Sequence, residues 1–168
     1  MPKPPLFWHR CEAYTDPAVT GQSMSANGTP SAAAAKWGNG LTGGTGASGP
    51  VIRASLGSGT LQKYSITWTI KSRYAVTNGV KADGRTVAIW FAVGTGAYYP
   101  QIGKSGYPLW FNFGAVSVEL TTEVGSWAAN DLVSFALTMD TGATTKTRIY
   151  KNGVQIWSST TGQSLALG

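Results

Sequence analysis

The chain lacks most of the side chains from which enzyme sites are built. It has one cysteine, Cys11, and one histidine, His9. An intramolecular disulfide, a cysteine-based zinc site and a pair of histidines are therefore excluded. Of its seven acidic residues, Glu119 and Glu123 lie four positions apart, as do Glu12 and Asp16. On a continuous strand the two residues of each pair would be ~13 Å apart, too far for the paired carboxylates of sugar hydrolysis. We therefore expect no enzymatic activity.

Charge and long apolar runs are also scarce. Charged residues make up 12% of the chain, against about a quarter in an ordinary soluble protein. Lys and Arg (13) outnumber Asp and Glu (7), which gives a formal net charge of +6. These cations are scattered, so we do not expect nucleic-acid binding. The candidate for a basic patch is one loose group, Lys71, Arg73, Lys81 and Arg85.

Targeting signals are absent as well. No apolar stretch of a signal peptide follows the Pro-rich start of the chain, residues 1–5, and no stretch is long enough to cross a membrane. We therefore expect a protein that is made in a cytoplasm and has no membrane partner.

The chain is rich in glycine (22) and in aromatic residues (7 Trp, 7 Tyr and 5 Phe). Short apolar or alternating segments between Gly-containing turns predict an all-β protein. The expected strands are 6–13, 51–56, 64–71, 86–93, 108–113, 115–121, 131–140, the two arms of a hairpin over 148–157, and 165–167. Only Ala32–Lys36 suggests a single helical turn. We expect two antiparallel sheets packed face to face in one domain, residues 6–168, preceded by an extended arm, residues 1–5.

The hairpin is the strongest local signal. Asn152-Gly153 stands between two runs of β-forming residues, and this dipeptide suits a two-residue type I′ turn, which needs positive φ at both positions. The turn predicts three facing pairs: Tyr150 with Gln155, Ile149 with Ile156, and Arg148 with Trp157. One predicted face holds Ile149, Lys151, Val154 and Ile156, and the other holds Arg148, Tyr150, Gln155 and Trp157.

Several segments, in order, carry a resemblance to a known family. They are Leu6-Phe7-Trp8, Ala35–Leu41 (AKWGNGL), Ser65–Lys71 (SITWTIK), Ser126-Trp127, Asp131–Thr138 (DLVSFALT) and Tyr150–Gly153 (YKNG). Together they resemble the concanavalin A-like, laminin-G-like jelly-roll family over residues 6–168. The resemblance implies a two-sheet antiparallel β-sandwich.

The chain departs from this family at its end. It stops at residues 165–168, before any segment similar to the strand with which the family closes its sheet. We therefore expect a sheet edge that is covered by the arm, by a loop or by a second subunit. We expect no cofactor. Calcium is the alternative that the family suggests, with candidate oxygen ligands at Asp16, Asn27 and Asp83, or at Asn130 and Asp131.

Compact jelly-roll domains without a signal peptide or disulfides resemble capsid decoration (cement) proteins and tail or fibre modules of bacteriophages. The resemblance implies a non-enzymatic virion structural protein, a decoration protein bound to capsid or tail subunits as a homo-oligomer or as part of a larger assembly. The candidate partner-binding arm is Pro2, Lys3, Pro4 and Pro5. The alternative is a carbohydrate-binding adhesin or tail-fibre module that recognises a host glycan. The candidate exposed rings, for a glycan or a neighbouring subunit, are Tyr98, Tyr99, Tyr107 and Trp127.

Overall fold

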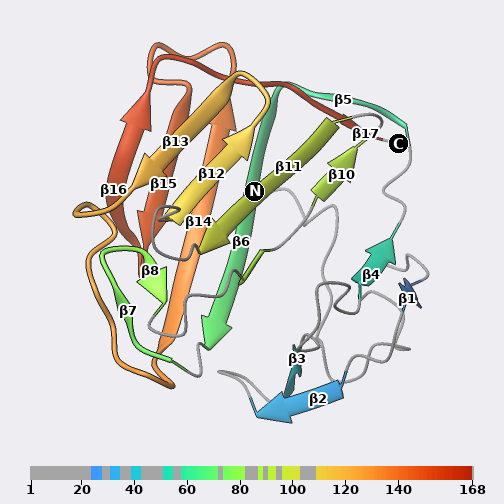
Figure 1. The fold of residues 1–168 in the computed structure, drawn as a ribbon. Coiled ribbons are helices and arrows are strands. Elements are labelled where there is room, and N and C mark those ends of the chain that lie inside the picture. The colour runs from blue at the N-terminus through green and yellow to red at the C-terminus, as the bar shows by residue number, and fades with distance from the viewer. Residues whose placement is uncertain are drawn as a thin grey trace. The chain divides into compact units, whose positions relative to one another are not determined.

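The computed structural model describes residues 24–27, 31–34, 39–42, 51–54, 58–71, 74–81, 87–88, 91–93, 96–102 and 109–167. Within these residues every regular element is a β-strand (Figure 1), and the strands pair antiparallel. The expectation of an all-β, antiparallel protein is therefore confirmed. The backbone forms two compact units, Met1–Ser58 with Gly168, and Gly59–Leu167. The expected arm at 1–5 and the expected strand at 6–13 lie outside the described residues.

The N-terminal unit contains two pairs of short strands. β1 (Met24–Asn27) pairs with β4 (Val51–Ala54), and β2 (Ser31–Ala34) pairs with β3 (Asn39–Thr42). The helical turn expected at Ala32–Lys36 is wrong, because β2 runs through most of it. A single turn of helix gains too few hydrogen bonds to offset its nucleation cost, whereas β2 gains a full partner in β3.

The C-terminal unit contains two larger sheets. The five-stranded sheet is formed by β9 (Val87–Ala88), β10 (Phe91–Val93), β11 (Gly96–Ile102), β12 (Leu109–Phe113) and β13 (Val116–Leu120). The four-stranded sheet has the order β16 (Val154–Ser159), β15 (Thr147–Lys151), β14 (Leu132–Asp140) and β6 (Lys63–Lys71). Two small pairs accompany them, β5 (Gly59–Leu61) with β17 (Leu165–Leu167), and β7 (Val76–Thr77) with β8 (Val80–Lys81).

The described parts of the apolar run at 86–93 are strands, as its composition predicts. These parts, β9 and β10, both pair with β11 in a single register, from Val87 opposite Ile102 to Val93 opposite Gly96. Among the described strands, neither has a second partner on its other side. The described parts of the run therefore lie at the border of the five-stranded sheet.

The core lies where side chains of both larger sheets meet. Along β14 every second side chain is buried, and the buried set is Val133, Phe135, Leu137 and Met139. Successive side chains of a strand point to opposite faces of the sheet. The alternation of apolar and polar residues in the sequence of β14 therefore matches the alternation of buried and more exposed side chains in the structure. Phe111 and Phe113 of β12 belong to the same cluster, and Trp68 of β6 packs against it. The Trp68 ring lies 5.7 Å from that of Phe135 and 5.9 Å from that of Phe111.

The last described strand, β17, is held within the C-terminal unit. β17 pairs with β5, which leads into β6. The segment before β17 is held at Gln163: the Tyr64 hydroxyl donates to the Gln163 carbonyl oxygen (2.9 Å), and the Ala115 N–H donates to Gln163 Oε1 (3.1 Å). The fully buried Thr147 hydroxyl donates to the Thr161 carbonyl oxygen at 2.6 Å. The chain's own backbone thus covers β5, whereas β6 itself pairs only with β14 among the described strands.

The position of Phe135 leads to a stability prediction. Phe135 is 2% exposed and contacts rings from two sheets. Phe135→Ala should therefore lower the free energy of unfolding by about 3–5 kcal/mol, as measured by urea denaturation. Val154→Ala is the matched control, because Val154 is 67% exposed, and its effect should stay within about 0.5 kcal/mol. Equal effects of the two substitutions would contradict the described core.

Candidate binding surface

The four-stranded sheet turns one face toward the core and the other away from it. On the second face the side chains of β6 are exposed, and those of β14 and β15 are half-buried. We call this surface the outer face. Its central residues are Ser65, Thr67 and Thr69 of β6, Ser134, Ala136 and Thr138 of β14, Arg148 and Tyr150 of β15, and Gln155 and Ser158 of β16. Most are short and carry hydroxyl groups, so the two largest side chains, Arg148 and Tyr150, stand among small neighbours.

The Asn152-Gly153 turn fixes one end of this face. The φ angles are 50° at Asn152 and 84° at Gly153, which confirms the type I′ turn. The Asn152 N–H donates to the Ser134 carbonyl oxygen (2.7 Å), and the Ser134 N–H donates to Asn152 Oδ1 (2.9 Å). The Ser134 hydroxyl in turn lies 2.8 Å from the Thr69 hydroxyl. The turn is therefore connected by hydrogen bonds through β14 to β6.

A β-bulge changes the hairpin beyond its first pairs. Tyr150 faces Gln155, as expected, but the register shifts between Ile149 and Tyr150. The observed pairs beyond the shift are Ile149 with Trp157 and Arg148 with Ser158. The two predicted pairs, Ile149 with Ile156 and Arg148 with Trp157, are therefore wrong. A bulge places an extra residue on one strand, and here it lets both Ile156 and Trp157 pack against the core.

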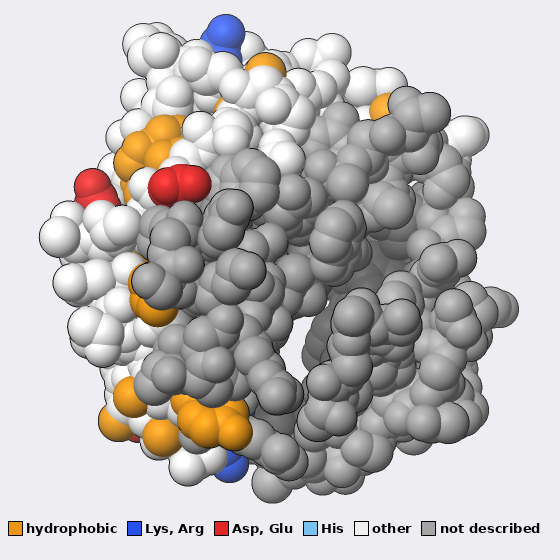
Figure 2. All heavy atoms as spheres, viewed as in Figure 1, with side chains coloured by type: hydrophobic (Ala, Val, Ile, Leu, Met, Phe, Trp, Pro, Cys, Tyr) orange, Lys and Arg blue, Asp and Glu red, His pale blue; other side chains and the backbone are white. Residues whose placement is uncertain are grey.

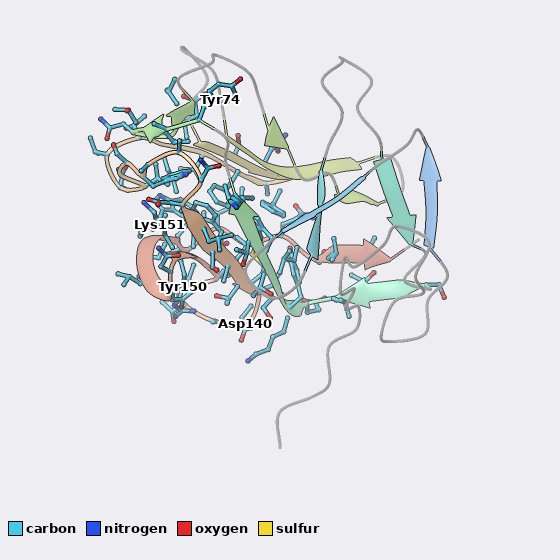
Figure 3. All side chains as sticks on the ribbon, turned by 90° about the horizontal axis from the view of Figure 1, so that it is seen from below. Tyr74, Asp140, Tyr150 and Lys151 are labelled. Atoms are coloured by element: carbon cyan, nitrogen blue, oxygen red, sulfur yellow. The ribbon has the colours of Figure 1, made fainter. Side chains whose placement is uncertain are left out.

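The charge on the outer face is positive. Its acidic residue, Asp140, forms an ion pair with Lys63 (2.8 Å) and accepts a hydrogen bond from the Gly142 N–H (3.1 Å). The hydrogen bond from Lys63 is the main cause that lowers the pKa of Asp140 below its ordinary value. Arg148 and Lys71 have no acidic partner within the residues whose side chains are described. In Figure 3, Tyr150 and Asp140 lie on one side of this unit and Tyr74 lies on the opposite side.

Trp127 does not offer an exposed ring. It is 8% exposed, and its backbone is paired with that of Val76 by two hydrogen bonds of 3.0 Å. Lys151 Nζ lies 4.6 Å from the centre of its ring and donates to the Val124 carbonyl oxygen at 2.6 Å. Burial lowers the pKa of Lys151. The prediction of an exposed Trp127 ring is therefore wrong, since two segments distant in sequence cover it.

The other predicted aromatic residues remain predictions. Tyr98 and Tyr99 lie on β11, opposite Phe91 and Asn112 respectively, but their side chains lie outside the described residues. Tyr107 and the arm residues Pro2–Pro5 lie outside them entirely.

On the face shown in Figure 2, the coloured Lys and Arg side chains are far apart and form no patch.

The acidic residues of the described part do not converge. Glu119 lies on β13, whereas Glu123 lies in the turn that follows it. Backbone hydrogen bonds, from its own N–H and from that of Thr121, lower the pKa of Glu123. Asp131 accepts a hydrogen bond from the Ala128 N–H (3.0 Å). Within the described residues, no three His, Cys, Asp or Glu side chains are grouped so that they could hold a metal ion. Of the other calcium candidates, Asp16 and Asp83 lie outside that part.

Comparison with known proteins finds no matching family model, no matching curated protein and no matching solved structure. The resemblance to the concanavalin A-like family therefore stays a prediction. Over the described ranges, the structure contains no helix with the length and apolar character of a membrane span.

The Lys63–Asp140 pair predicts a pH dependence of stability. Because the pKa of Asp140 is lowered on folding, its contribution is fully present above the unfolded pKa and is lost as the pH falls through the folded one. Asp140→Asn should therefore lower the melting temperature at pH 7, and the difference from the original chain should shrink as the pH falls below the ordinary pKa of an aspartate, about 3.9. Lys63→Gln should cause a similar loss at pH 7. A difference that persists unchanged down to pH ~2 would contradict this assignment.

Proposed function

We propose that the chain is a non-enzymatic structural protein of a bacteriophage-like particle, a decoration protein with a jelly-roll β-sandwich fold. In this role the protein binds neighbouring capsid subunits and performs no chemistry on them. Many copies bound to one shell would add their individual affinities as avidity.

The shared core supports the sandwich part of the proposal. The Phe111 and Phe135 rings come from the two different larger sheets and lie 6.5 Å apart. Val116 and Leu120 of β13 are buried in the same cluster as Leu137 of β14. Two sheets that bury their inner faces against each other form a sandwich. The proposal goes further than a sandwich, because it also assigns the jelly-roll order to the strands.

The border of the four-stranded sheet carries the docking part of the proposal. Among the described strands, β16 pairs only with β15, which leaves its other edge without a partner strand. Val154, the first residue of β16, is 67% exposed. Unpaired backbone groups beside an exposed apolar side chain favour the addition of another chain. We assign this edge to a neighbouring subunit of the particle.

A second candidate function is supported by a different surface. The outer face presents Tyr150 and Arg148 of β15 among hydroxyl groups. This surface is polar and is made of side chains, whereas the β16 edge is made of backbone groups beside an apolar side chain. This set favours the carbohydrate-binding adhesin or tail-fibre module, and its ligand is the subject of the next subsection.

The test of the structural role is the composition of purified particles. Phage-like particles from cells that carry the gene should contain the chain, detected by mass spectrometry after a density gradient. Val154→Lys should abolish incorporation, because a charge on this edge blocks strand addition, while circular dichroism of the isolated variant stays unchanged. Thr67→Lys adds the same charge on the outer face of β6 and should leave incorporation intact. Particles without the original chain would refute the proposal.

A further inference from the structure

We infer that the outer face of the four-stranded sheet binds an acidic, carboxylate-bearing glycan, centred on Tyr150 and Arg148. This inference does not depend on whether the chain belongs to a particle, and its site differs from all the aromatic residues that the sequence suggested. It follows from the register of the sheet, from the charges on this face and from the side chains that surround the two central residues.

The register places complementary groups in two adjacent rows across the sheet. The first row is Ser158, Arg148, Thr138 and Ser65, and the second is Gln155, Tyr150, Ala136 and Thr67. Arg148 and Tyr150 point to the same side of β15 and are roughly 7 Å apart along the strand. Ala136, the residue opposite Tyr150 on β14, is too small to cover the ring. An aromatic ring, a guanidinium and an amide thus occupy neighbouring positions on one face of the sheet.

Each of these groups suits one part of a sugar. The face of an aromatic ring packs against the apolar C–H face of a pyranose. The surrounding hydroxyls of Ser65, Thr67 and Thr138 can both donate and accept hydrogen bonds, as sugar hydroxyls do. The guanidinium of Arg148 matches a carboxylate with two parallel N–H donors. A single uronic-acid residue would offer all three partners at once.

Charge selects an anion over a neutral sugar. Asp140 is already paired with Lys63 at 2.8 Å. Arg148 and Lys71 have no acidic partner in the part of the chain with described side chains. Within that part the face keeps two uncompensated cations, Arg148 and Lys71, and a bound carboxylate would neutralise the one beside Tyr150.

The same observations disfavour other polyanions. Nucleic-acid affinity grows with the number of phosphates that are neutralised, and two cations provide little of it. A protein partner would need an apolar centre to its interface. Among the central residues of the outer face, Ala136 is the only aliphatic side chain, and the others are polar apart from the ring of Tyr150. A hydroxylated, singly charged ligand is the better match.

The experiment is a calorimetric titration of the isolated chain with oligogalacturonate. A neutral galactose oligomer of equal length is the control ligand. The original chain should bind the acidic oligomer and not the neutral one. Tyr150→Ala and Arg148→Gln should each weaken binding at least about tenfold, as loss of an anchoring side chain does. Tyr150→Phe keeps the ring and should stay within about threefold of the original affinity.

A second charge variant distinguishes binding at a defined site from non-specific attraction of the ligand by the positive charge of the face. Lys71→Gln removes the same charge as Arg148→Gln but lies at the far end of β6, so it should weaken binding by no more than about threefold. Circular dichroism checks that every variant is folded. The inference is refuted if the original chain does not bind oligogalacturonate, or if Tyr150→Ala leaves the affinity unchanged. Equal affinity for a polyglutamate peptide or an oligo-dT of matched charge would also refute it. None of these results depends on particle incorporation.

Discussion

The alternation of β14 is the constraint on which the rest of the C-terminal unit depends. This strand lies between β15 and β6 and pairs with both along most of its length. Its inward side chains, such as Phe135 and Leu137, are buried in the core that the two larger sheets share. Its outward side chains include Ser134, Ala136 and Thr138 between Leu132 and Asp140 at the two ends. A slip of one residue would exchange the two sets, burying hydroxyls and exposing a phenylalanine, so the register is strongly fixed.

The bulge in the hairpin decides which side chains share the outer face. Without it, Trp157 would stand opposite Arg148 and cover part of this surface. The shift places Ser158 there instead and brings Trp157 against the core. The bulge thus has two consequences. It adds apolar burial on the inner side, and it leaves the outer face to small polar groups around Arg148 and Tyr150.

Local signals predicted the parts of the structure that depend on neighbours in sequence. The Asn152-Gly153 turn, the pair of Tyr150 with Gln155 and the alternation along 64–71 and 132–139 all follow from spacing within one segment. The grouping of Arg148, Tyr150 and Gln155 on one face was also predicted. A second short hairpin, in which Asn78-Gly79 with positive φ at both residues joins β7 to β8, was not among the expected strands, although the same Asn-Gly signal is present there.

Features that depend on distant segments were not predictable in this way. Trp127 is buried because its backbone pairs with Val76, far away in the sequence, and no local pattern around Trp127 indicates that partner. The position of the bulge likewise depends on packing in the core and not on the turn, because the bulge allows both Ile156 and Trp157 to pack against the core. For the same reason the mixed composition of the outer face becomes visible only when β6, β14, β15 and β16 are placed side by side.

The two surfaces proposed for the four-stranded sheet use different directions of the same element. Strand addition at β16 would use backbone N–H and C=O groups, which lie in the plane of the sheet, whereas ligand binding at Tyr150 would use side chains, which stand perpendicular to it. Occupation of the edge therefore leaves the ring and the guanidinium accessible. In these proposals Val154, at the edge, would meet an apolar group of the neighbour, and Arg148, on the face, would meet an anionic group of the ligand. Attachment to a neighbour and recognition of a glycan are then compatible within one sheet, because neither removes the groups that the other needs.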